Sequence, residues 1–199
     1  MKSINPASSK FIKAYLPHSN DEATAIISET QNTWSNWKQS GFQERSSLML
    51  RAAAILREDK EALALLMTIE MGKVTTEALA EIEKCAWVCD FYAEKAESFL
   101  ADEMVETNAS KSFISYEPLG IVLAVMPWNF PFWQVFRFAA PTLMAGNAAV
   151  LKHASNVPGC ALAIENLFIK AGFPDNLFRA LMIPASQVEP VIMNPQVKA

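Results

Sequence analysis

Clustered charge is absent from this sequence of 199 residues. Charged residues make up 19% of the chain, the net charge is −4 at pH 7, and no five consecutive residues carry the same sign. A nucleic-acid-binding surface or a polybasic membrane patch requires clustered Lys and Arg, so neither a nucleic-acid nor a membrane partner is expected. Hydrophobic residues make up 51% of the chain, which excludes a disordered polypeptide and allows a large core.

A long uninterrupted hydrophobic run is also missing. The stretch that comes nearest to a membrane span, 130–151, contains Arg137, two prolines and the pair Gly146-Asn147. We expect a buried helix followed by a buried strand there, not a span. The first ten residues have no apolar segment typical of a signal peptide, so we expect a cytoplasmic protein.

Cysteine is scarce, with three residues, and an odd number without a secretory signal indicates a reduced, cytosolic chain. Cys85 and Cys89 share a helical face, but two thiols without a nearby His make a poor metal site, so packing is their expected role and no metal is predicted. Cys160 stands at the start of a predicted helix, where a thiolate would be stabilised. It is therefore weighed as a nucleophile against a buried structural residue.

The region 1–105 is predicted to be mainly helical. Helices are expected from Asn20 or Asp21 to about Trp37, over 44–59, over 60–72 with a terminating Gly72, and from about 75 to 100. The last of these carries a hydrophobic stripe at three-and-four spacing. Its members are Leu79, Ile82, Ala86, Cys89, Ala93, Ala96 and Leu100.

The region 110–199 alternates strands and helices. Strands are expected over 111–118, over 120–127 as a run buried on both faces, over 147–152 and over 176–183. Helices follow the prolines near 131, the pair Ser155-Asn156 as cap, and Ser186, and the second of them ends at Gly172. The order β-α-β-α-β-α predicts an α/β fold with a parallel sheet, which has a ligand crevice at the carboxyl ends of its strands.

Four side chains follow directly on such strand ends, and each has a plain reading and a functional one. Asn129, in an apolar frame, suits a helix cap as well as a ligand contact. Lys152 is often only the point where a strand meets solvent. His153 reads first as a solvated or capping side chain, and Trp128 as part of the apolar frame. Arg137 is either a surface arginine or, among Phe132, Trp133, Phe136 and Phe138, a residue that needs an anion. The Gly-x-Gly dinucleotide fingerprint is absent.

The chain resembles the aldehyde dehydrogenase superfamily over essentially its whole length. The resemblance rests on "EPLGIVLAVMPWNFP", on "AGNAAVLKHAS", on "AGFP" before the third strand, and on the helical opening from "INPAS" to "EMGK". Within the superfamily, "WNFPFWQVFR" and "LKHAS" look most like bacterial succinate-semialdehyde dehydrogenases. The fold class implied is N-terminal helices followed by part of a Rossmann-like parallel sheet.

The resemblance implies roles for the residues at these strand ends. Asn129 would donate an amide N–H to the aldehyde oxygen as negative charge develops on it. Arg137, with Trp133, would bind the distal carboxylate of the substrate. The cofactor NAD or NADP would lie against Met126, Pro127, Trp128, Asn129, Lys152, His153, Ala154 and Ser155.

Three departures from the common family pattern stand out. Ser155 replaces a glutamate that would repel a 2′-phosphate, which implies that NADP is tolerated. His153 stands in place of a common proline, and Phe138 in place of a lysine after the substrate arginine. Cys160 is not in the family's nucleophile context, which favours the structural reading of its thiol.

The resemblance also implies what this stretch does not hold. We expect 1–199 to be an incomplete NAD(P)-binding domain without the catalytic domain that carries the nucleophilic Cys and the activating Glu. Two hypotheses follow: the N-terminal portion of an NAD(P)-dependent enzyme that oxidises a semialdehyde, such as succinate semialdehyde, or an inactive truncated remnant that at most binds nucleotide or a partner. A homo-oligomer is expected only for the full-length enzyme. The chain alone is expected to be inactive and poorly soluble, with 178–183 as an exposed sheet edge.

Overall fold

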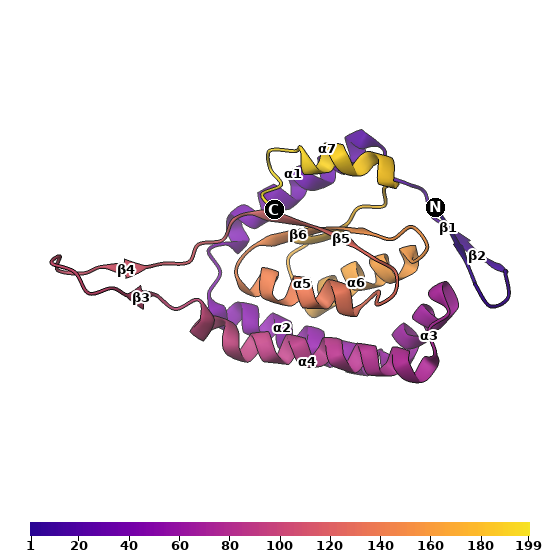
Figure 1. The fold of residues 1–199 in the computed structure, drawn as a ribbon, viewed down its shortest axis with the longest axis horizontal. Coiled ribbons are helices and arrows are strands. Elements are labelled where there is room, and N and C mark those ends of the chain that lie inside the picture. Colours follow the sequence, from indigo (N-terminus) through magenta and orange to yellow (C-terminus); the bar gives the residue numbers. More distant parts are fainter.

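The computed structural model describes all 199 residues, and it arranges helices in layers around a small parallel sheet (Figure 1). The helices are α1 (Asn20–Trp37), α2 (Phe42–Glu58), α3 (Lys60–Met71), α4 (Thr75–Phe99), α5 (Trp133–Met144), α6 (Pro158–Ala171) and α7 (Val188–Ile192), with a 3-10 turn η1 (Ala185–Gln187). The strands are β1 (Lys2–Ile4), β2 (Phe11–Ala14), β3 (Glu103–Met104), β4 (Phe113–Ile114), β5 (Ile121–Met126), β6 (Ala148–His153) and β7 (Phe178–Ala180).

Local signals fix three of the helix boundaries. Gly72 and Gly172 end α3 and α6 in the left-handed region, with φ of 78° and 92°, as their positions predict. The start of α1 is capped by Ser19, one residue before the predicted cap, because the Ser19 hydroxyl and the Glu22 carboxylate form a reciprocal capping box. Pro141 lies inside α5, which still runs to Met144.

The predicted parallel α/β sheet is confirmed, with strand order β5-β6-β7. Helices α1 and α7 lie over one face of the sheet, and α5 and α6 lie under the other (Figure 1). A further layer of α2 and α4 covers α5 and α6 from outside, so the central sheet and its two crossover helices are enclosed (Figure 1). The mixed α/β fold class expected from the sequence is therefore correct.

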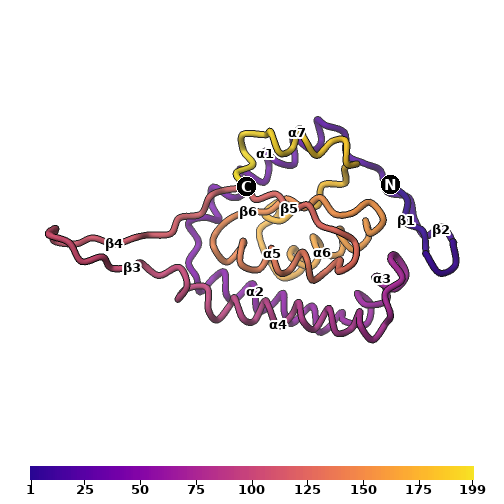
Figure 2. The backbone as a smooth tube through the Cα atoms, in the orientation of Figure 1, coloured from indigo at the N-terminus to yellow at the C-terminus, as the bar shows by residue number.

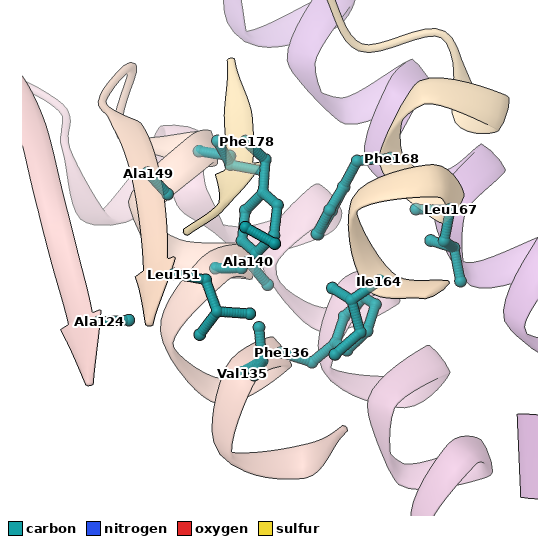
Figure 3. Packing of buried hydrophobic residues seen from close by; sticks show 14 of the residues in the cluster. Ala124, Val135, Phe136, Ala140, Ala149, Leu151, Ile164, Leu167, Phe168 and Phe178 are labelled. Carbon is teal, nitrogen blue, oxygen red and sulfur yellow. The ribbon is translucent and has the colours of Figure 1, made fainter. Parts of the chain in front are cut away.

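The core lies between the sheet and the helices α5 and α6. Phe168 of α6 stacks on Phe136 of α5, with ring centroids 5.4 Å apart, and tilts against Phe178 of β7 at 4.8 Å (Figure 3). All three rings are buried, and each contributes on the order of 2–3 kcal/mol from removing apolar surface from water. This contact joins both crossover helices to the last strand.

Several strands differ from the sequence expectation. The stretch 111–118 forms only the two-residue strand β4, which pairs with β3 in a thin arm that extends away from the body (Figure 2). The antiparallel hairpin of β1 and β2 was missed, because the opening residues were grouped with the helical half. β5 is not buried on both faces, since Val125 is 53% exposed.

The stretch 178–183 contains an edge strand of the sheet, as expected, but this edge is largely covered. All residues there except the half-buried Arg179 are buried, and three of the outward backbone groups are bonded. The Ala180 N–H donates to the Glu165 carboxylate at 2.7 Å, and the Met182 N–H and carbonyl both bond to His18. At the opposite edge, β5 takes up the last residues of the chain, where the Lys198 N–H donates to the Ile121 carbonyl at 2.8 Å. No helix is both long and apolar enough to cross a bilayer.

Candidate functional site

The carboxyl ends of β5 and β6 lie side by side and open at one edge of the sheet. Met126 of β5 is paired in register with His153 of β6, and Val125 with Lys152. The loop 127–132 leaves β5 at this point and enters α5, while Ala154 and Ser155 leave β6. The residues predicted for a ligand crevice are therefore brought together by strand register, as expected for a parallel sheet.

Asn129 is exposed in this loop, and its side-chain amide forms no hydrogen bond within the chain. The cap reading of Asn129 is wrong. α5 begins at Trp133 without a side-chain cap from the loop, and its first N–H groups are taken by another residue. The amide of Asn129 is thus free to donate to a ligand.

The N-terminus of α5 is capped by Glu81, a buried residue of α4. One carboxylate oxygen, Oε1, accepts from the backbone N–H groups of Phe132 and Trp133, both at 2.9 Å. The other oxygen, Oε2, forms a close ion pair with Lys73, and the Lys73 ammonium also donates to the Asn129 carbonyl at 3.2 Å. Glu81 is 4% exposed and Lys73 7% exposed, so the pair is shielded from water.

His153 is buried, which overturns its reading as a solvated side chain. Nδ1 accepts from the Ala154 N–H at 2.8 Å, so the ring proton is on Nε2, which donates to the Pro131 carbonyl at 2.9 Å. Burial lowers the pKa of this imidazole, and the bond to Pro131 opposes that change only in part. His153 therefore ties the end of β6 to the loop after β5.

Trp133 borders a pocket of about 320 Å³ between α4 and the loop. The Lys84 ammonium lies 3.9 Å from the centroid of the Trp133 ring. The pocket is lined by Lys73, Glu77, Ala80, Glu81, Lys84, Phe130 and Trp133. Figure 1 shows α4 and α5 running beside each other at this position.

Arg137 does not lie in an aromatic cage. Phe132 and Phe136 point into the core, whereas Arg137 is exposed one helical turn after Trp133. Its guanidinium donates to the Gln134 side chain at 2.8 Å and forms no ion pair. Phe132 and Phe136 lie on the buried side of α5, and the arginine is left open to an anion from outside the chain.

Lys152 is the fifth residue of β6 and lies near its carboxyl end. It is only 8% exposed, and its ammonium has neither a hydrogen bond nor an ion pair within the chain. Ser155 is exposed beyond it, and Ala154 is half-buried. On the β5 side, Met126 is half-buried, and Pro127 and Trp128 are exposed. The Lys152 ammonium is not among the buried polar atoms without a partner, so it reaches solvent and is free to donate to an acceptor outside the chain.

The cysteines are structural. Cys85, Cys89 and Cys160 are buried and unpaired. Burial raises the pKa of each thiol well above its ordinary range, which keeps the sulfur protonated and unreactive. No group of three His, Cys, Asp or Glu residues is placed to hold a metal ion.

Three residues of the site escaped the sequence analysis: Lys73, Glu81 and Glu70. Glu81 lies three residues after Ala78 and four before Cys85, on the buried face of α4. A carboxylate at such a stripe position requires a buried partner, which was the available signal. Glu70 of α3 caps the N-terminus of α6, as Glu81 caps that of α5. Its carboxylate accepts from the backbone N–H groups of Gly159 and Cys160 at 3.0 and 2.9 Å. It replaces the expected Ser155 or Asn156 cap.

Known proteins with similar sequences indicate the family of this chain. Residues 1–199 match the aldehyde dehydrogenase family. A probable NADP-dependent succinate-semialdehyde dehydrogenase of Synechocystis is 50% identical over 98% of this chain, and the NADP-dependent succinate-semialdehyde dehydrogenase of Mycobacterium leprae is 45% identical over 98%. The chain spans 43% and 44% of the lengths of these two relatives.

Solved structures agree with the sequence relatives. The succinic semialdehyde dehydrogenase of Streptococcus pyogenes, solved with NADP+, superposes with a TM-score of 0.94 at 33% identity, over 98% of this chain and 43% of that one. A betaine aldehyde dehydrogenase of Staphylococcus aureus, solved with NAD+, gives 0.93 at 26% identity, over 99% and 41%. The match to the family over the whole chain, together with this fold, shows that the chain belongs to the aldehyde dehydrogenase family.

Proposed function

We propose that the chain supplies the cofactor groove, the oxyanion donor and a substrate anchor for NAD(P)-dependent oxidation of a semialdehyde, namely succinate semialdehyde, to the acid. The observation that carries the proposal is the pair of unpartnered donors at one edge of the sheet. Asn129 offers an exposed amide at the end of β5, and Lys152 offers an ammonium without a partner at the end of β6.

The role of Asn129 is electrostatic. When a thiolate adds to the aldehyde carbon, negative charge develops on the carbonyl oxygen, and the Asn129 N–H donates a hydrogen bond to it. One such preorganised donor is worth a factor of about 10²–10³ in rate. None of the three cysteines of this chain is exposed, so the proposal requires a nucleophile from a further part of the protein.

The dinucleotide supplies a hydride acceptor when it is bound. Lys152 would donate to a ribose hydroxyl, and the exposed backbone at Pro127 and Trp128 would border the nicotinamide side. Ser155 places no negative charge beyond Lys152, so a 2′-phosphate is not repelled. The NADP-dependent relatives from Synechocystis and Mycobacterium leprae support the same preference.

Arg137 is the proposed anchor for the distal carboxylate of the substrate. It is exposed, it has no ion pair, and a guanidinium can bind a carboxylate through two parallel hydrogen bonds. Trp133 lies one turn earlier on α5 and would contact the aliphatic part of the same substrate. Assembly into a homo-oligomer is proposed only for the complete enzyme.

The test uses the full protein encoded by the reading frame that carries this chain. Asn129→Ala should lower kcat for succinate semialdehyde by about 10²–10³. Arg137→Gln should raise KM for succinate semialdehyde and leave KM for an uncharged aldehyde of similar length unchanged. Equal turnover by wild type and Asn129→Ala would reject the proposal, and a reading frame that stops after this chain, without turnover, would favour the remnant.

A further inference from the structure

Three buried side chains hold the loop that carries Asn129. Lys73 donates to the Asn129 carbonyl, His153 donates to the Pro131 carbonyl, and Glu81 accepts from two N–H groups at the start of α5. We call Lys73, Glu81 and His153 the loop clamp. They come from the α3–α4 connection, from α4 and from β6, so three separate parts of the chain converge on one short segment.

The ion pair in the loop clamp does more than a helix cap requires. Glu70 caps α6 through two backbone N–H groups without any ion pair. Removing Lys73 and Glu81 from water is costly, and a buried ion pair is a poor source of net stability compared with apolar packing. The Glu81 cap differs from the Glu70 cap because its partner Lys73 also contacts the loop. The Lys73 ammonium donates to the Asn129 carbonyl and lies 3.8 Å from the Phe130 ring centroid.

The loop has a competing conformation built into its sequence. Asn129 stands three residues before Phe132, so its side chain could cap α5 by accepting from the Phe132 N–H if the helix began at Phe130 instead of Trp133. In the observed structure Glu81 already occupies the Phe132 N–H, so Asn129 has no helix end to cap. The carboxylate of Glu81 and the carboxamide of Asn129 are therefore rival acceptors for the same donor.

We propose that Glu81, supported by Lys73 and His153, is a positioning residue that excludes Asn129 from the helix cap and so keeps its amide open to the crevice. The inference rests on the proposed function for its purpose, but its structural content stands without cofactor or substrate. Without Glu81, the orphaned Phe132 N–H takes the Asn129 side-chain oxygen as its partner, and the amide is drawn onto the start of α5.

Hydrogen exchange on the 199-residue chain tests the rivalry between the two acceptors. In the wild type, Asn129→Ala should leave exchange at the Phe132 amide unchanged, because Asn129 does not bond it. In a Glu81→Ala background, Asn129→Ala should speed exchange at Phe132 about tenfold, the factor that corresponds to one lost cap of about 1.4 kcal/mol. Glu70→Ala is the matched control, and it should affect the Gly159 and Cys160 amides while leaving Phe132 alone.

A second readout follows the Asn129 side chain itself. Its amide signals in an NMR spectrum, identified by their loss in Asn129→Asp, should shift in Glu81→Ala and stay in place in Glu70→Ala. Glu81→Gln keeps one acceptor oxygen and the side-chain shape, and it should hold the wild-type signals better than Glu81→Ala. This milder variant also covers the case in which Glu81→Ala does not fold.

Two outcomes would overturn the inference. One is equal sensitivity of Phe132 exchange to Asn129→Ala with and without Glu81. The other is identical Asn129 amide signals in the wild type, Glu81→Ala and Glu81→Gln. Because neither experiment includes NADP or aldehyde, such a result would leave the proposed oxidation untouched, whereas a failed turnover test would leave the positioning role of Glu81 untouched.

Discussion

The helices α5 and α6 start at the same edge of the sheet, and both are capped by a carboxylate from a distant helix. Glu81 caps α5 and Glu70 caps α6, each through two backbone N–H groups. The difference lies in the surroundings. Glu81 is paired with Lys73 below an exposed loop, whereas Glu70 has no ion pair and is enclosed by Gly159 and Cys160.

This comparison shows that neither helix N-terminus is free to bind an anion. Helix N-termini at the carboxyl edge of a parallel sheet are ordinarily sites for phosphate or carboxylate, because free N–H groups and the helix dipole attract negative charge. Here both ends are already filled by the protein's own carboxylates. Recognition of a negatively charged ligand by this part of the chain is therefore left to side chains such as Lys152, Lys84 and Arg137, none of which has an ion pair within the chain.

The largest difference between the two caps should appear when each carboxylate is removed. Glu81→Met should cost about 3–5 kcal/mol of unfolding free energy, because it leaves Lys73 buried and unpaired. Adding Lys73→Met should recover part of this loss, while the coupling between Lys73→Met and Glu70→Met should be smaller because Glu70 has no ion pair. Urea unfolding of the single and double variants measures both couplings. A Glu81→Met loss that Lys73→Met does not reduce would remove the distinction between the caps.

The close packing of Gly159 against the Glu70 cap of α6 predicts the second-largest effect on stability. A Cβ at Gly159 would lie 2.8 Å from a Glu70 oxygen, so Gly159→Ala should cost about 1–3 kcal/mol by overpacking. Gly41, which precedes α2 with open space around it, is the matched control, and Gly41→Ala should change stability by about 0.5 kcal/mol or less. Thermal unfolding compares the two. Equal changes would mean that Glu70 moves aside easily.

Alkaline pH should lower the free energy of unfolding through Cys160, a buried residue of α6. Burial first, and the Glu70 carboxylate next, raise the pKa of the Cys160 thiol, so the unfolded chain ionises before the folded one. Stability is then lost as pH rises above about 8.5, by up to about 1.4 kcal/mol per pH unit for each thiol. Urea unfolding should show a smaller alkaline loss in Cys160→Ala, with Cys85 and Cys89 still contributing. An unchanged loss would contradict the assignment.

Acidic pH should lower the free energy of unfolding through His153, which bonds to the loop before α5. This is the smallest of the expected effects. Burial lowers the pKa of His153, so the unfolded chain binds a proton first as pH falls. Stability is lost below about pH 6.5, by at most about 1.4 kcal/mol per pH unit, until the folded pKa is reached. His18, whose pKa burial also lowers, contributes with the same sign, so the measurement uses a His18→Asn background. There, His153→Asn should flatten stability between about pH 5 and about pH 6.5.

Sequence-local features were predicted well, and long-range ones were not. Gly72 and Gly172 end their helices as expected, since a left-handed glycine is a signal contained within one turn. Asn129 and Asn156 were predicted as caps by the same local rule and were displaced by Glu81 and Glu70. Those carboxylates are far away in the chain. The position of Glu81 on the buried face of α4 predicts that it has a buried partner, but not which helix it caps.

The candidate site also has features that the sequence predicted and features that depend on the folded structure. Strand register brings together the ends of β5 and β6, which the alternating pattern of strands and helices predicted. The environment of Arg137 was not predictable from its neighbours, because adjacent residues on a helix face different directions. The burial of His153 depends on the Pro131 carbonyl across the crevice, which only the folded loop provides.

Both edges of the sheet are partly occupied by the chain's own groups. Glu165 and His18 occupy the outward N–H groups of Ala180 and Met182, which are positions that an incoming strand would need. At the opposite edge, β5 bonds to the segment 197–199 through Ile121 and Leu123. A strand from a neighbouring molecule would therefore have to compete with existing hydrogen bonds at either edge, which disfavours self-association by strand addition.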